Sequence, residues 1–298
     1  MSAAYDIGCA VGAKASELID GTPPGYVTIG GSYADIGPSF SHYDDLPGDQ
    51  ITGSYGAFST ALNSVAIAGQ GSSNLIADAI TVTPNSAFAN MDRIVGDVDD
   101  WTGEAATDFV ENYKAQLPYV ADSQFTGISV AIAALEAQHE LYATAYESII
   151  DIGNKTLSAL EATDGRGTAV ATFSLTVLAA VGTVAVTVLT AGTGTAAGVA
   201  ITIAVASGAA ASAASATSLE FSAEEPEQVM DKFYEAVGKV ENHVRTRQQE
   251  IAQGLRDYAA AVNDDINKTS YADSEYPRFT FKPTGFAQGP GGLGGYGG

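Results

Sequence analysis

The residues that could carry chemistry in this chain are few and scattered. A single cysteine, Cys9, excludes an intramolecular disulfide, and a small buried side chain explains it better than a nucleophile does. The histidines His42, His139 and His243 lie far apart in the sequence, so together with Cys9 they give no spacing typical of metal ligands. We therefore expect neither a metal site nor a cofactor.

Catalytic motifs are equally scarce. Asp97, Asp99 and Asp100 indicate a solvated acidic corner, and the Gly-x-Gly of residues 192–194 has no lysine or acidic partner at a useful distance along the chain. Nothing resembles a nucleophile elbow or a phosphate-binding loop. We expect that the chain is not an enzyme.

Two long apolar stripes with helical spacing dominate the rest of the chain. Such stripes indicate helix-on-helix packing, and helices this long normally pair antiparallel. Pro226 is tolerable in a first helical turn, and Ser222 with Glu225 has the pattern of a capping box. The first stripe is Phe125, Ile128, Ile132, Leu135, His139, Tyr142, Tyr146, Ile149, Leu157 and Leu160; the second, in a helix over about 224–267, is Val229, Phe233, Val237, Val240, Val244, Arg247, Ile251, Leu255, Tyr258 and Val262.

Between the stripes lies a segment without charge, from Gly167 to Leu219. Its two halves, separated by a turn at 190–195, are each long enough to cross a bilayer as a helix. We expect an apolar helical hairpin, although its many Thr and Val residues leave a β-hairpin open. It could be a buried core pair, a segment that inserts into a membrane after a switch, or a permanent anchor. The candidate membrane-contacting residues are Val170, Phe173, Leu175, Leu178, Val181, Val184, Val186, Val188, Leu189, Val199, Ile201, Ile203 and Val205.

The remaining chain divides by composition. Residues 1–84 are acidic; they predict a short helix over 3–20, an irregular Gly/Pro-rich segment over 21–56 and weak short helices after it. Residues 85–275 hold the helical bundle with 167–219 inserted, and 276–298 form an extended Gly-rich tail. The predicted fold is all-α: an elongated antiparallel bundle with a helical hairpin near Trp101, two long helices and the apolar helical hairpin between them.

Charge narrows the range of partners. Thirteen basic residues face 35 acidic ones, and the net charge is −22. Nucleic-acid binding requires Lys and Arg to neutralise phosphates, so we expect no nucleic-acid partner. The first twenty residues lack a basic start and an apolar run, and therefore predict no cleavable secretory signal.

The most informative motif surrounds the only tryptophan. Trp101 and Gly103 are followed by Ala105, Ala106 and Phe109, between two helical patterns. Gly103 permits a tight turn or a close helix approach, and the alanines leave room for a neighbouring helix. Trp101 would pack across this helical corner. An ordinary core tryptophan at such a corner is the alternative.

This motif resembles the Trp-x-Gly family of type VII secretion substrates and the related PPE-type proteins. The resemblance covers about residues 87–163 and implies a helical hairpin with its turn at Trp101 and Gly103. It also implies an export motif read by the secretion ATPase, in which a tyrosine precedes an acidic residue by four positions; Tyr271 and Glu275 match it just beyond the last helix. Small family members have only two helices, so this much longer chain departs from them.

Two functions remain open. The resemblance implies a secreted or cell-surface structural or interaction protein, with the type VII machinery or a chaperone as partner and with self-association as an option. Alternatively, the order of long helix, apolar hairpin and long helix resembles α-helical pore-forming toxins of the cytolysin A type, in architecture alone. That resemblance implies a membrane-inserted form that uses residues 168–216.

Overall fold

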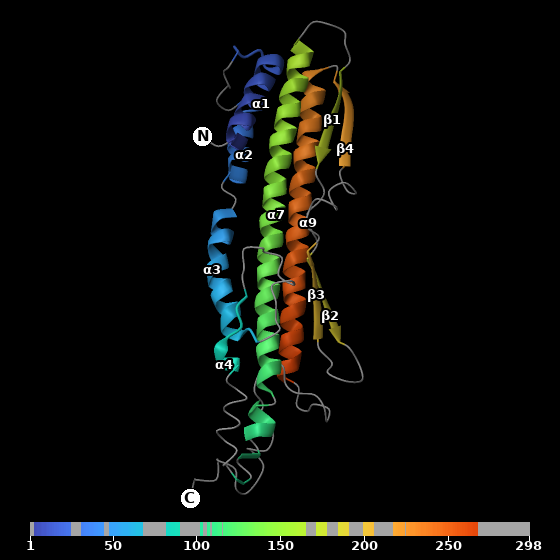
Figure 1. The fold of residues 1–298 in the computed structure, drawn as a ribbon. Helices are drawn as coiled ribbons and strands as arrows, with labels where there is room; N and C mark the ends of the chain where they lie inside the picture. Colours follow the sequence, from blue (N-terminus) through green and yellow to red (C-terminus); the bar gives the residue numbers. More distant parts are fainter. Residues whose placement is uncertain are drawn as a thin grey trace, which may run out of the picture. The chain divides into compact units, whose positions relative to one another are not determined.

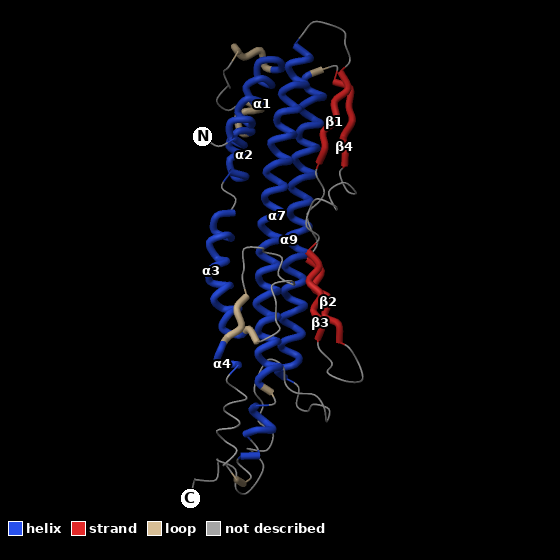
Figure 2. The backbone as a smooth tube through the Cα atoms, in the orientation of Figure 1, coloured by secondary structure: helices blue, strands red, loops and turns tan. Residues whose placement is uncertain are grey.

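The computed structural model describes residues 3–24, 31–44, 48–67, 82–89, 102–103, 106–107, 109–114, 116–164, 171–177, 184–190, 199–205, 217–223 and 225–267. Most of these residues are helical (Figures 1 and 2). The shorter helices are α1 (Ala3–Ile19), α2 (Ile36–Asp44), α3 (Gly48–Val65), α4 (Ser86–Ala89) and the π-helical turn η2 (Phe109–Lys114). The two long helices are α7 (Leu117–Asp164) and α9 (Pro226–Asn267). The predicted helical bundle with two long helices is thereby confirmed.

Contacts divide the chain into two compact units, each built from separate stretches of sequence. The first unit comprises Met1–Thr52, Glu136–Val184 and Ala204–Ala252, and the second comprises Gly53–Leu135, Ala185–Ile203 and Gln253–Gly298. Each long helix therefore contributes its larger part to the first unit and the rest to the second. Helices α1 and α2, from the acidic N-terminal region, belong to the first unit together with parts of α7 and α9.

The core of the first unit draws on four helices. Its fully buried side chains come from α1, α2, α7 and α9, and include Val11, Phe40, Ile149, Leu160 and Phe233. In this unit α7 and α9 lie side by side and run in opposite directions (Figure 1). Gln248 of α9 donates a hydrogen bond to the Tyr142 hydroxyl of α7 across this contact. The pairing follows from the two apolar stripes, because each helix removes its stripe from water by packing it against the stripe of the other helix.

Small residues bring α1 and α2 together. A Cβ on Gly8 would lie 3.0 Å from the Cα of Gly37, and a Cβ on Gly12 would lie 2.7 Å from the carbonyl oxygen of Tyr33. The Asp44 carboxylate accepts hydrogen bonds from the backbone N–H groups of Ala4 and Tyr5, at 3.1 and 3.0 Å. It thus satisfies donors that the first turn of α1 leaves without an intrahelical partner.

The helical structure of residues 36–44 and 48–56 corrects the sequence prediction, which made 21–56 irregular, whereas the short helix predicted after residue 56 agrees with the rest of α3. Glycine, proline and serine have low helix propensity, and that suggested loops. The structure instead places α2 and the start of α3 in this segment. Tertiary packing explains the difference for α2, because Ile36, Phe40 and Tyr43 lie on one face and are buried in the first unit's core.

The second unit has its own small core. Leu62, in the last turn of α3, and Ala66, directly after this helix, pack with Phe125 and Ile132 of α7. Asn85 fixes the segment after α3, since its side-chain amide donates to the Ser64 carbonyl and its backbone N–H donates to the Ala66 carbonyl. Between Phe125 and Ile132 on α7, a Cβ on Gly127 would lie 2.7 Å from the Tyr258 hydroxyl of α9, so the two helices are also close in this unit.

The uncharged segment forms strands, and this corrects the predicted apolar helical hairpin. The strands are β1 (Ala171–Val177), β2 (Val184–Thr190), β3 (Val199–Val205) and β4 (Thr217–Ala223). β1 pairs antiparallel with β4, and β2 pairs with β3, so the inner pair is nested in sequence within the outer pair. The register matches apolar types, with Phe173 opposite Phe221 and Leu175 opposite Leu219. The physical reason is the density of β-branched Val, Ile and Thr, which favour strands.

Among the residues that the structure describes, no helix has both the length and the apolar character needed to cross a bilayer.

Candidate functional site

The tryptophan motif is described only in part. Trp101 and Ala105, as well as Tyr271 and Glu275 of the second export motif, lie outside the described residues. Ala106 and Phe109 are described, and the Phe109 ring stacks on that of Tyr113 with 6.0 Å between centroids. The packing of Trp101 across a helical corner therefore stays a prediction.

Gly103 has a backbone conformation that glycine favours. Its φ is +115°, a region that residues with a Cβ rarely occupy. The Gly103 carbonyl accepts hydrogen bonds from the N–H groups of Ala106 and Thr107, at 3.1 and 3.2 Å. These are the bonds of a first helical turn. The described backbone thus bends at Gly103, and Ala106 and Thr107 close a helical turn onto its carbonyl.

Of the residues predicted to contact a membrane, those that the structure describes lie in three of the four strands. Phe173 and Leu175 lie in β1; Val184, Val186, Val188 and Leu189 lie in β2; Val199, Ile201, Ile203 and Val205 lie in β3. Val170, Leu178 and Val181 lie outside the described residues. The strand pairing brings β2 next to β3, the two strands with the most of these apolar residues.

The cysteine and the histidines do not come together. Cys9 packs in α1 against Gly37 of α2, where a Cβ would lie only 2.4 Å from the cysteine sulfur. Within the described ranges, no group of three or more His, Cys, Asp or Glu side chains could hold a metal ion.

His243 is the most unusual of the three histidines. Its Nε2 is buried and lacks a hydrogen-bond partner among the described residues. Burial lowers the pKa of His243, nearby Arg247 lowers it further, and Glu250 opposes the shift. The native state therefore favours the neutral ring, and protonation at acidic pH opposes folding of the first unit.

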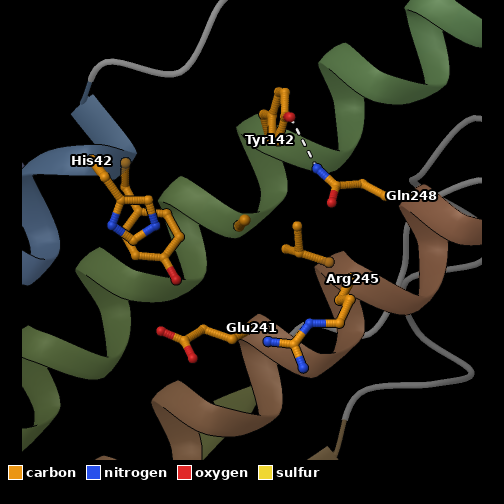
Figure 3. A pocket seen from close by; sticks show the side chains of 8 residues that line it. His42, Tyr142, Glu241, Arg245 and Gln248 are labelled. Atoms are coloured by element: carbon orange, nitrogen blue, oxygen red, sulfur yellow. Dashed lines mark hydrogen bonds between the residues drawn. The ribbon is translucent and has the colours of Figure 1, made fainter.

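A pocket of about 450 Å³ opens in the first unit between α2, α7 and α9 (Figure 3). It combines small apolar side chains with charged and hydrogen-bonding ones. Its lining consists of His42 and Tyr43 from α2, Tyr142 and Ala145 from α7, and Glu241, Val244, Arg245 and Gln248 from α9. Successive turns of α9 supply its four residues, because positions three and four apart share a helix face.

The groups in this pocket are held by their neighbours. Gln248 Nε2 donates to the Tyr142 hydroxyl at 2.9 Å, which leaves the phenolic hydrogen available to a ligand. The His42 ring lies 3.8 Å from the Tyr43 ring, and its Nδ1 donates to the Ser39 carbonyl. Burial, together with the Glu241 carboxylate, raises the pKa of Tyr43 to about 12, so its hydroxyl remains protonated at neutral pH.

The sequence alone indicates only part of this pocket. Tyr142 and Val244 belong to the predicted stripes, and His42 has no role in the sequence beyond that of a possible metal ligand. Glu241 and Arg245 are four residues apart on α9, which is a common arrangement on a solvated helix face. The contribution of α2 to the pocket does not follow from the sequence, because the sequence predicts an irregular segment there.

Comparisons with known protein families, with curated proteins and with solved structures find no match for this chain.

Proposed function

We propose that this chain is a non-enzymatic protein exported by a type VII secretion system, which acts outside the cell or at its surface as a structural or interaction component. The observation that carries this proposal is the turn at Gly103. Its left-handed backbone comes two residues after the only tryptophan, and helical hydrogen bonds follow immediately. A glycine in this conformation at the start of a helical turn fits the predicted Trp-x-Gly corner.

The first unit supports the proposal in a second way. It combines α1, α2 and the larger parts of α7 and α9 around one core that a single chain supplies. Such a bundle needs no second chain to cover its apolar stripes, in contrast to a small two-helix hairpin. A net charge of −22 favours solubility and disfavours nucleic acid as a partner.

Substituting Gly103 tests the export proposal. We expect Gly103→Val to reduce the exported fraction to background in a bacterium with an active type VII system, because a β-branched residue is strained at φ +115°. The measurement is the ratio of protein in the culture filtrate to protein in the cells. Wild-type export should also vanish in a strain whose secretion ATPase is inactive.

Gly21→Val is the matched control for this test. Gly21 also has a positive φ, +69°, and like Gly103 it has open space where a Cβ would be. At Gly21 a β-branched residue is strained on the order of 1–2 kcal/mol. The strain at Gly103 is larger, because φ +115° lies beyond the left-handed helical region. If both variants lose export equally, or if export does not depend on the ATPase, the proposal is wrong.

A second function is favoured by the strands of the uncharged segment: insertion into a membrane. The sequence alone allowed this segment to be a buried core pair, a segment that inserts into a membrane or a permanent anchor, and in the structure it forms strands. It connects the two long helices as two nested strand pairs that carry no charge from residue 171 to residue 205. Contact with lipid would bury this apolar sequence.

Liposomes test the membrane function directly. We expect the wild-type protein, purified without detergent, to float with liposomes and release trapped dye at mildly acidic pH. Val184→Lys combined with Ile201→Lys should abolish both, since each charge in hydrocarbon costs about 2.5–3.5 kcal/mol. Asn242→Lys with Gln249→Lys adds the same charge at exposed positions of α9 and should leave both unchanged. Absence of flotation by the wild type at both neutral and acidic pH would rule out this function.

A further inference from the structure

The pocket between α2, α7 and α9 contains an unusual cation. Basic residues are scarce in this chain, and in the described ranges nearly all of them are engaged with a carboxylate or another polar group. Arg245 is the exception: among the described residues it alone of the lysines and arginines makes no hydrogen bond or ion pair. Its guanidinium lies at the edge of the pocket (Figure 3).

Arg245 is exposed and makes no ion pair with the described residues, so its guanidinium is available to an external anion. Acidic residues outnumber basic ones by 35 to 13, so the chain has many carboxylates with which Arg245 could have paired. Arg247, two residues further along α9, pairs with Glu250 in this way. Guanidinium groups bind carboxylates through two parallel hydrogen bonds, which makes a carboxylate the best-matched anion.

The other walls of the pocket restrict what the carboxylate is attached to. Ala145 and Val244 provide an apolar surface, and His42 and Tyr43 provide an aromatic one. Tyr142 retains a hydroxyl hydrogen to donate to the ligand, whereas Glu241 can only accept hydrogen bonds from it. This set suits a ligand with a carboxylate, a nearby N–H group and an apolar or aromatic side chain.

We propose that this pocket binds the carboxylate of a peptide segment, with Arg245 as its anchor and Glu241 as the acceptor for a neighbouring N–H. The carboxylate could belong to an acidic side chain or to a chain end of the partner protein. This inference goes beyond the proposed export and does not depend on it, because the pocket lies within the first unit and away from Gly103 in sequence.

A pair of small ligands tests the proposal. N-Acetylphenylalanine carries the carboxylate, the N–H and an aromatic side chain, while its primary amide differs only in lacking the charge. We expect the acid to bind with a Kd on the order of 1 mM, given its size and the open pocket. The amide should bind about tenfold more weakly, because a charge-assisted pair is lost. Amide NMR spectra of the full chain would follow the signals of His42, Tyr142 and Gln248.

Protein variants locate the anchor. Arg245→Gln should weaken binding of the acid about tenfold and leave binding of the amide unchanged. Arg256→Gln is the matched control: it removes the same charge from the same helix, at a residue whose guanidinium bonds to Gln253. Tyr142→Phe removes the donated hydroxyl hydrogen and should weaken binding of the acid by a smaller factor.

The outcomes are decisive in both directions. The proposal is wrong if the acid does not shift these signals, if acid and amide bind equally, or if Arg256→Gln weakens binding as much as Arg245→Gln. The α-amide of N-acetylaspartic acid, which carries only a side-chain carboxylate, identifies the source. Tighter binding of this probe indicates an acidic side chain, and tighter binding of N-acetylphenylalanine indicates a chain end.

Discussion

Phe233→Ala should lower the free energy of unfolding of the first unit by about 3–5 kcal/mol, the usual cost of removing a buried phenylalanine ring. Phe233 is 1% exposed and is among the largest fully buried side chains among the described residues. Its ring centroid lies 5.7 Å from that of Phe40, so it joins α9 to α2. Truncation would leave a cavity where the helices meet. Urea unfolding followed by far-UV circular dichroism would measure the change.

The neighbouring Tyr234 provides the control for this prediction. Its ring also contacts Phe233, with centroids 5.3 Å apart, but its side chain is 47% exposed. Tyr234→Ala therefore removes an aromatic ring without opening a buried cavity, and should cost about 1 kcal/mol. Equal losses in the two variants would show that Phe233 does not lie at the centre of the core.

The long helices could be predicted because their signal is local. The spacing of Phe125, Ile132, Ile149 and Leu160 marks one face of a helix, and all four are buried in α7. The second stripe is correct over most of its length, yet Leu255 is 39% exposed. Periodicity shows that a face is apolar, but which turns of that face are covered depends on partners elsewhere in the chain.

The uncharged segment shows where length and composition conflict. Each of its two halves is as long as a membrane-spanning helix, and this length favours the prediction of a helical hairpin. Their Val, Ile and Thr content favoured strands, and the structure has strands from Ala171 to Ala223. A strand also requires a partner to complete its backbone hydrogen bonds. The pairing of β1 with β4 joins residues up to 52 positions apart, such as Ala171 and Ala223, and a local pattern does not contain that information.

The pocket could not be predicted, because folding alone brings its walls together. Tyr142 and Gln248, which share a hydrogen bond, are 106 positions apart. His42 and Tyr43 come from α2, in a segment whose composition suggested a loop. What the sequence does contain is the scarcity of basic residues. Because basic residues are scarce, an unpaired one is unusual. Arg245 makes no ion pair with the residues that the structure describes.

Gly12→Ala should destabilise the first unit by about 1–3 kcal/mol, as is usual when an added methyl group forces a packed backbone to move. A Cβ at Gly12 would lie 2.7 Å from the carbonyl oxygen of Tyr33, closer than real Cβ contacts allow. Backbone cannot rotate away as the end of a side chain can, so α1 would have to shift from the segment that precedes α2. Chemical denaturation of the full chain would measure the loss.

Gly238→Ala is the matched substitution with the opposite expected sign. Gly238 lies within α9, and nothing lies within 4 Å of the place where its Cβ would be. Alanine there should stabilise the protein by about 0.5–1 kcal/mol, because it favours helix over the unfolded chain. At Gly12 the same gain in helix propensity is present, so a net loss must come from the clash with Tyr33. A stabilising Gly12→Ala would mean that α1 and the Tyr33 segment are less tightly packed than the structure has them, and that the Asp44 cap, not glycine packing, holds α1 in place.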